Sequence, residues 1–270
     1  MEINKELLPR GVYKFTVTVP WEDIKKVRSA VVSEAASNVA VKGFRKGHAP
    51  TNLVEDTLDD GKVYGEVINH LVPEVLTTIT KENKLEIISQ PKIQVTKFET
   101  EQPVNLLVTI ITSPKFVVGD WRQILTDNKP AKKDDALGVI VGKTTIELPE
   151  ELVAEERDRM LGRLLQQIES LGLQVDAYAA SQNKTIDDIK KEYFLQAEKS
   201  LKMHFTLNEL VNLEKIEVTD AEIEAAVKAA PDENSKKALA NPDQKWYIKS
   251  VLARNKALEV IYAYLNSHGN

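Results

Sequence analysis

The sequence has 270 residues, with 36 Lys and Arg against 41 Asp and Glu, a net charge of −5 and 42% hydrophobic residues. This is the composition of a soluble globular protein of one large or two modest domains, and its negative charge argues against a broad basic face for nucleic acid, so any RNA contact must be local. The absence of cysteine excludes thiol nucleophiles, disulfides, zinc ribbons and iron–sulfur ligation, and favours a cytoplasmic location. Residues 1–10 lack the apolar stretch of a signal peptide, and no window is apolar enough to cross a bilayer, so we expect no membrane contact.

The chain begins with a strand pattern followed by a helix pattern. Apolar and polar residues alternate over 13–19, which predicts a half-buried strand that ends at Pro20. Apolar residues then recur at spacings of three and four over 21–39, which predicts an amphipathic helix. Lys25, Arg28 and Glu34 fall on its polar side.

Beyond a loop at 40–50, the sequence predicts two helices and three strands. A short helix at 53–58 is interrupted at Gly61, and a longer one follows over 63–79. Strand-like runs occupy 85–89, 92–98 and 104–112. A strand, helices and then three strands predict an α+β domain with a largely antiparallel sheet, which we assign to residues 1–118.

A polar segment separates this domain from the rest of the chain. The hydrophobic pattern thins over 119–147, and the stretch 127–135 is charged and contains a proline, so we interpret this segment as an interdomain linker. Its apolar patch at 137–141 has an alternative interpretation, a short strand that returns to the sheet.

Residues 148–270 have helical patterns throughout and predict an all-α domain. The expected elements are a helix at 149–172, a short one near 175–180, a long one at 185–215 with a capping signal at Thr185 and Asp188, a second capping signal at 219–222, and a last helix that opens at Pro242. Helices of about 24 and 30 residues extend roughly 35–45 Å. We therefore expect elongated arms with exposed apolar flanks that bind other chains.

The segment with the most specific chemistry is Lys42 followed by Gly43-Phe44-Arg45-Lys46-Gly47-His48-Ala49-Pro50. Two glycines flank one aromatic ring and two cations, which suits docking onto an anionic surface with an apolar pocket, such as a ribonucleoprotein. The alternative is a plain connection whose Phe packs onto its own domain while the cations are solvated.

This octapeptide resembles the signature loop of the trigger factor family, the bacterial chaperones at the ribosomal exit tunnel. The order of elements over residues 1 to about 118 is similar to the family's ribosome-binding domain, and the run 146–152 resembles the start of its arm-bearing, SurA-like C-terminal domain. The resemblance implies that Phe44, Arg45 and Lys46 dock, with Lys42 beside them, and that Gly43, Gly47 and Pro50 shape the loop.

The resemblance also implies partners and a mechanism. The expected partners are the large ribosomal subunit near the exit tunnel, both protein and rRNA, and nascent or unfolded polypeptides. It implies a chaperone without ATP or another cofactor, and a homodimer away from the ribosome. A rival hypothesis is an assembly or scaffold chaperone that serves one dedicated protein partner without the ribosome.

One departure from the family pattern concerns enzymatic activity. Family members usually carry an FKBP-like prolyl isomerase domain between the two parts, but here the interval 119–147 has 29 residues. Independent domains rarely have fewer than about 50 residues, so we expect no isomerase domain and no enzyme. No metal-ligand pattern or catalytic motif accompanies the histidines, serines and threonines.

The client-binding residues of the helical domain are expected at helix edges, where Met and aromatic side chains adapt to varied apolar partners. The candidates are Met160, Tyr178, Tyr193, Phe194, Met203 and Tyr264. Most other apolar residues there, such as Leu164, Leu165, Ile168 and Phe205, are expected in the core.

Overall fold

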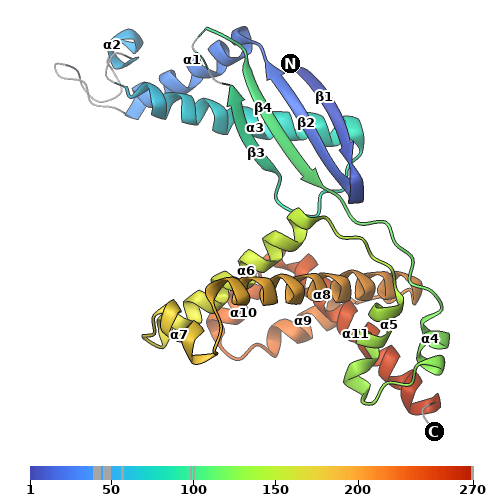
Figure 1. Cartoon of the computed structure of the whole chain (residues 1–270). Helices are drawn as coiled ribbons and strands as arrows, with labels where there is room; N and C mark the ends of the chain where they lie inside the picture. The colour runs from blue at the N-terminus through green and yellow to red at the C-terminus, as the bar shows by residue number, and fades with distance from the viewer. Residues whose placement is uncertain (39–43, 45–49, 56–57, 98, 100, 269–270) are drawn as a thin grey trace. The chain divides into compact units, whose positions relative to one another are not determined.

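The computed structural model describes residues 1–38, 44, 50–55, 58–97, 99 and 101–268. The chain divides into two compact units, Met1–Ser113 and Pro114–Asn270. The first is α+β and the second is all-α, as the sequence predicts (Figure 1).

The first unit is built on a four-stranded antiparallel sheet with the order β1-β2-β4-β3. The strands are β1 (Glu2–Leu8), β2 (Val12–Val19), β3 (Lys92–Lys97) and β4 (Val104–Ile111), and the 3-10 turn η1 (Pro9–Gly11) joins the first two. The central pair aligns Phe15 with Val108 and Val17 with Leu106, so the alternating apolar residues of both strands face the same side.

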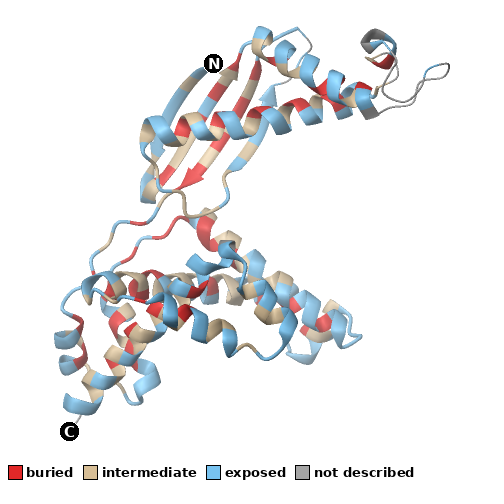
Figure 2. Cartoon of the chain, turned by 180° about the vertical axis from the view of Figure 1, so that it is seen from behind, coloured by how far each residue is buried: buried red, intermediate tan, exposed pale blue. Residues whose placement is uncertain are grey.

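Helices α1 (Trp21–Asn38) and α3 (Asp60–Asn83) cover this face, and the short α2 (Thr51–Glu55) lies between them in sequence. Buried residues recur every fourth position along α3, which gives the helix one apolar side: Val63, Val67, Leu71, Val75 and Ile79. Figure 2 shows the buried residues on the strands and on the helix that packs against them. Asp59 caps α3 by accepting a hydrogen bond from the backbone N–H of Lys62 at 3.0 Å.

Two features of the sheet differ from the sequence-based expectation. The predicted strand at 85–89 is only an isolated bridge from Ile87 to Thr112. The edge strand β1 carries polar residues on both faces, so its sequence lacks the alternation of apolar and polar residues that predicts a strand. It forms a strand because it pairs with β2.

The second unit contains eight α-helices among its described residues. They are α4 (Trp121–Asp127), α5 (Ala136–Lys143), α6 (Glu150–Ser170), α7 (Val175–Ser181), α8 (Ile186–Leu213), α9 (Asp220–Lys228), α10 (Glu233–Leu239) and α11 (Lys245–His268), with 3-10 turns η2 (Lys133–Asp135) and η3 (Pro242–Gln244). The sequence did not predict α4, α5 or α10. None of the helices in the described part of the chain is long and apolar enough to cross a membrane.

Both predicted helix caps are confirmed. The Thr185 hydroxyl oxygen accepts from the N–H of Asp188 at 3.1 Å, while the Asp188 carboxylate accepts from the N–H of Thr185 at 3.0 Å. The carboxylate also accepts from the Thr185 hydroxyl at 2.6 Å, and this bond, followed by the one from the N–H, lowers the pKa of Asp188. Thr219 and Glu222 form the same reciprocal pair at the start of α9.

The segment 119–147 is not the linker, nor 137–141 the strand, that the sequence suggested. It contains α4 and α5, whose buried residues join those of α8 and α11 in one hydrophobic cluster: Val118, Trp121, Leu125, Ala136, Leu137, Ile140, Leu207, Leu210, Ala257 and Ile261. Its many charged residues lie on exposed helix faces and turns, so the sequence resembles that of a linker, although five apolar residues of the segment belong to the cluster.

Candidate functional site

The loop singled out by its sequence lies between α1 and α2, and the structure describes Phe44 and Pro50 of it. Phe44 keeps 43% of its surface exposed. Lys42, Gly43, Arg45, Lys46 and Gly47 lie outside the described residues. The described part of the loop therefore presents one aromatic side chain to solvent.

Pro50 immediately precedes α2, the helix that follows the loop. Its carbonyl accepts hydrogen bonds from the backbone N–H groups of Leu53 at 3.0 Å and Val54 at 3.2 Å, which closes the first turn of α2. Proline suits this place because its fixed φ is helical and its missing N–H would have no helical partner. The side chain of Val54 is fully buried and fixes the short helix on the first unit.

Arg28 of α1 clamps the two elements that follow the loop. Its guanidinium pairs with Glu55 at the end of α2, lies 3.5 Å from Asp60 at the start of α3, and sits 5.6 Å from the ring centroid of Tyr64. The hydrogen bond to Glu55 is the main reason that the pKa of Arg28 is raised. With 22% of its side chain exposed, Arg28 holds α2, the helix that follows the loop, against α1.

Sequence reasoning missed this role, because Arg28 lies on the polar side of its helix and its partner Glu55 is 27 residues away. No spacing rule links the two positions. The chemistry of the loop is readable from the sequence, but the clamp that positions α2 is not.

In the second unit, α6 and α8 pack together and α7 closes their end. The buried residues of this cluster are Leu164, Ile168, Ala179 and Ile189. Tyr178 and Tyr193, two of the predicted client-binding residues, are half-buried against it, and burial raises the pKa of Tyr193. Met160 and Phe194 are also half-buried.

The last two candidates, Met203 and Tyr264, pack against the cluster that contains Trp121. The Tyr264 ring meets the Trp121 ring edge to face at 5.3 Å, and its hydroxyl lies 2.9 Å from the Thr126 hydroxyl. All six candidates are thus partly covered, and Tyr264 is held by specific contacts.

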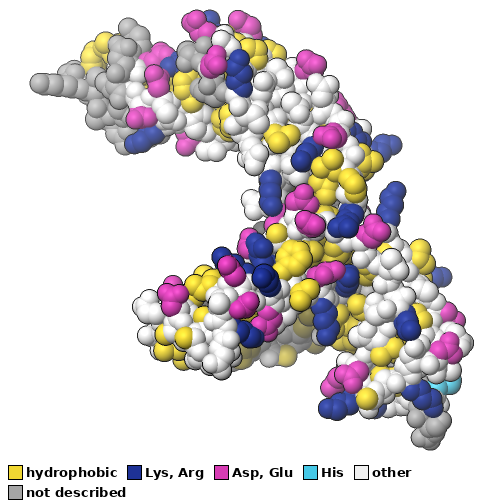
Figure 3. All heavy atoms as spheres, viewed as in Figure 1, with side chains coloured by type: hydrophobic (Ala, Val, Ile, Leu, Met, Phe, Trp, Pro, Cys, Tyr) yellow, Lys and Arg dark blue, Asp and Glu magenta, His cyan; other side chains and the backbone are white. Residues whose placement is uncertain are grey.

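The most exposed large apolar side chains of this unit lie elsewhere. They are Val117, Leu165, Leu171, Leu173, Ile186, Leu195, Leu213, Trp246 and Tyr247, with exposed fractions from 39% to 80%. Leu165 is a correction to the expected core: it is 40% exposed, while its neighbour Leu164 is buried in the cluster with Ile189 of α8. Neighbours on a helix point about 100° apart, and here the direction of Leu165 is the one that faces solvent. Figure 3 shows hydrophobic side chains among charged ones on the visible surface of the unit.

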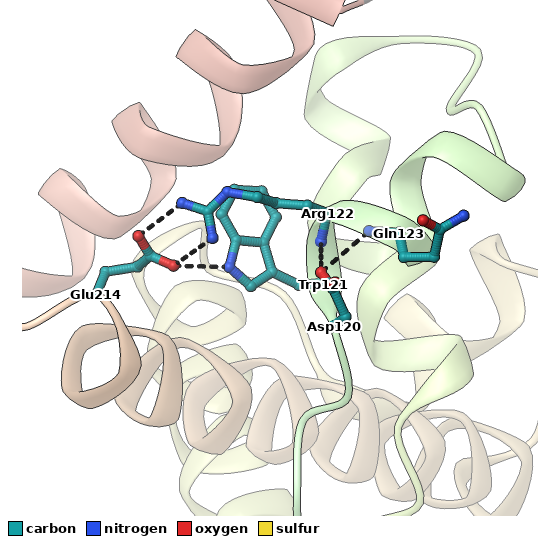
Figure 4. Close-up of polar contacts among 5 residues, drawn as sticks. All are labelled: Asp120, Trp121, Arg122, Gln123 and Glu214. Carbon is teal, nitrogen blue, oxygen red and sulfur yellow. Dashed lines mark hydrogen bonds and ion pairs between the residues drawn. The ribbon is translucent and has the colours of Figure 1, made fainter.

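A polar cluster ties α4 to the end of α8 within the second unit (Figure 4). The Glu214 carboxylate accepts two hydrogen bonds from the Arg122 guanidinium, both at 2.8 Å, and one from the Trp121 indole N–H at 2.9 Å. The bond from Arg122 is the main reason that the pKa of Glu214 is lowered. Asp120 caps α4 by accepting from the N–H of Arg122 at 3.0 Å and of Gln123 at 3.2 Å.

These contacts hold the C-terminal end of α8, the longest helix described in the unit, against α4. The bidentate pair and the indole bond together occupy three of the roughly four acceptor sites of the Glu214 carboxylate. In the described ranges, no group of three or more His, Asp and Glu side chains is placed to hold a metal ion.

Comparisons with known proteins agree with the resemblance noted in the sequence. A family model described as bacterial trigger factor protein matches residues 1–138, and the model of the trigger factor C-terminus matches residues 122–263. A trigger factor from Streptococcus pneumoniae (strain JJA) is 33% identical over 121 residues, 45% of this chain and 28% of that protein. One from Corynebacterium diphtheriae is 28% identical over 135 residues, 50% of this chain and 30% of that protein. The matches thus span less than a third of these relatives.

A solved structure shares the fold over nearly the whole chain. It is described as "Promiscuous Substrate Recognition in Folding and Assembly Activities of the Trigger Factor Chaperone" and superposes with a TM-score of 0.62, covering 97% of this chain and 99% of that one at 11% identity. At this identity the likeness concerns the fold alone.

Proposed function

The chain belongs to the trigger factor family, and we propose that it is an ATP-independent molecular chaperone that docks at the ribosomal exit tunnel and shields nascent or unfolded polypeptides. The observation that carries the proposal is the combination of an exposed Phe44 in the family's loop with a helical unit that exposes large apolar side chains. The site of action we propose is the cytoplasm.

The loop supports docking on the large ribosomal subunit. Phe44 is available for an apolar pocket on a ribosomal protein, while Lys42, Arg45 and Lys46 carry the charges that suit rRNA phosphates. Three phosphate contacts give modest, salt-sensitive affinity, because each releases condensed counterions. The Arg28 clamp supports the same role by holding α2, the helix that follows the loop, against α1.

The second unit supports binding of unfolded chains. Its exposed leucines lie on α6, α8 and the adjoining turns, and Trp246 and Tyr247 at the start of α11 are 71% and 49% exposed. Dispersed apolar side chains bind exposed segments of a client weakly, and release follows when the client's own folding buries more apolar surface. This cycle needs no nucleotide, and the sequence contains no GxxxxGK(S/T) phosphate loop.

We also propose that the chain is not a prolyl isomerase. The two family matches overlap at residues 122–138, which leaves no residues between them for a domain of about 50 residues. The same overlap falls on α4 and α5, which belong to the core of the helical unit. A refolding reaction limited by proline isomerisation should proceed no faster with this chain than with an inert protein at equal concentration.

Co-sedimentation with purified bacterial ribosomes tests docking. The wild-type chain should pellet with ribosomes at low salt and less at moderate salt, and the variant F44A/R45A/K46A should stay in the supernatant. A matched control, L7A/K62A/K81A, removes one exposed apolar residue and two exposed cations elsewhere on the first unit and should pellet like the wild type.

Equal pelleting of the loop variant and the control would overturn the assignment of the loop. If no form pellets, the rival hypothesis of a dedicated protein partner replaces ribosome docking, since the helical surface would remain to bind it.

A further inference from the structure

A cavity of about 240 Å³ lies between the turn that follows α4 and the C-terminal end of α11, and none of the exposed leucines described above lines it. Figure 1 shows the end of α11 beside α4 and α5. Leu125, Tyr264 and Leu265 give it an apolar wall. Its volume corresponds to about eight water molecules, which suits one large side chain rather than a drug-sized ligand.

The rim of the cavity is cationic. Lys129, Lys132 and Lys133 line it together with His268, and all four side chains are exposed. No carboxylate within the described ranges forms an ion pair with any of the three amines. Three ammonium groups beside an apolar wall are complementary to a ligand that combines carboxylates with an apolar group.

The aspartates of the same segment do not occupy this rim. Residues 127–135 contain three Asp as well as three Lys, but no Asp lines the cavity. Asp127 accepts a hydrogen bond from the Gln123 side chain at 2.7 Å, and Asp134 accepts one from the Tyr262 hydroxyl at 3.3 Å. The segment is therefore neutral overall, but its three lysines line the cavity and its three aspartates do not.

The walls are held in place before any ligand arrives. The Tyr264 hydroxyl bridges to the Thr126 hydroxyl at 2.9 Å, and the His268 ring stacks on the Tyr264 ring with centroids 4.5 Å apart. Leu125 is 1% exposed and belongs to the core of the unit. A preorganised wall lowers the entropic cost of binding.

From this arrangement we propose that the cavity binds an acidic peptide segment, with its carboxylates on Lys129, Lys132 and Lys133 and one apolar side chain against Tyr264 and Leu265, which Leu125 supports from the core. A nucleic acid fits less well, because a phosphate backbone makes no use of an apolar wall. The helical unit would then bind two kinds of partner segment: acidic segments in this cavity and apolar segments on its dispersed exposed side chains.

A titration of the ¹⁵N-labelled full chain with a blocked pentapeptide of three glutamates and two leucines tests the proposal. The backbone amide signals of Leu125, Lys132 and Leu265 should shift, and the dissociation constant should rise roughly fivefold or more in K129Q/K132Q/K133Q, since exposed charge pairs contribute little each. The control K199Q/K237Q/K249Q removes the same charge from exposed positions elsewhere in the unit and should bind like the wild type.

Two further probes separate the alternatives. The same peptide with glutamines in place of glutamates should bind more weakly, and a hexathymidylate strand should not shift these signals. The proposal is overturned if the cavity amides do not respond to the acidic peptide, if both lysine variants lose affinity equally, if the glutamine peptide binds as tightly, or if the oligonucleotide binds through the same lysines. None of these readouts involves ribosomes, so failure of the acidic-peptide proposal would leave the proposal of ribosome docking unaffected.

Discussion

Replacing Ile140 of α5 with alanine tests whether the segment 119–147 is part of the helical core. The Ile140 side chain is fully buried in the cluster that joins α4, α5, α8 and α11. Ile140→Ala removes three carbon groups at ~0.8 kcal/mol each and leaves a cavity, so the free energy of unfolding of the second unit should fall by about 2–5 kcal/mol. Ile140→Val removes one carbon group and should cost only about 0.5–1.5 kcal/mol.

The assay is urea unfolding followed by tryptophan fluorescence. The chain has three tryptophans, and Trp21 lies in the first unit while Trp121 and Trp246 lie in the second. In a Trp21→Phe background the fluorescence therefore reports only the second unit, which avoids treating a two-unit chain as a single two-state system. The control is Val117→Ala, because Val117 is 80% exposed and its loss should change the free energy by less than about 0.5 kcal/mol.

A loss below about 0.5 kcal/mol for Ile140→Ala would refute the reasoning, because a linker residue has no packing to lose. A graded series, in which valine lies between isoleucine and alanine, would establish that α5 is part of the core.

Two further predictions concern the contacts that position α2 and α9. Arg28→Ala removes the ion pair with Glu55 and should destabilise the packing of α2 by about 1 kcal/mol, a modest loss because Glu55 is partly solvated. Hydrogen exchange at the Val54 amide should therefore accelerate. The control Lys25→Ala, at an exposed position of the same helix, should leave this exchange rate unchanged. At the cap of α9, hydrogen bonds from Lys256 and then Thr219 lower the pKa of Glu222 to about 2. The folded-state pKa is depressed, so the stabilisation is present above the unfolded value of about 4.3 and is lost as the pH falls toward 2. Glu222→Gln should flatten the pH dependence of stability in that window, and an unchanged profile would contradict the assignment.

A final prediction addresses client binding by the second unit. Leu171→Ser, Leu173→Ser and Leu195→Ser together should reduce suppression of aggregation of a denatured protein, because these side chains are 68%, 45% and 66% exposed and available to a client. The wild-type chain should act equally well with and without ATP. Serine substitutions that leave the suppression intact would place client binding elsewhere.

The local elements of this protein were largely predictable from its sequence. The period of two over β2 and β4, the spacing of four along α3, and the Thr–acid signals at the starts of α8 and α9 are all properties of neighbouring residues. These patterns depend on residues within one or two turns of each other, so they predict local structure without knowledge of the fold. The composition of the loop around Phe44 is likewise a local property, and it indicated the family that the comparisons identify.

Contacts between distant segments decided the rest. The strand β1 exists because β2 pairs with it, and the segment 119–147 joins the helical core because Trp121, Leu125 and Ile140 find partners more than sixty residues later on α8 and α11. Arg28 and Glu214 acquire their roles from partners 27 and 92 residues away. Whether a side chain is buried depends on which helix and sheet faces pack together in the folded chain, and the periodicity of the sequence does not determine this packing. For that reason the predicted client-binding residues proved half-buried, while the exposed leucines emerged only from the tertiary structure.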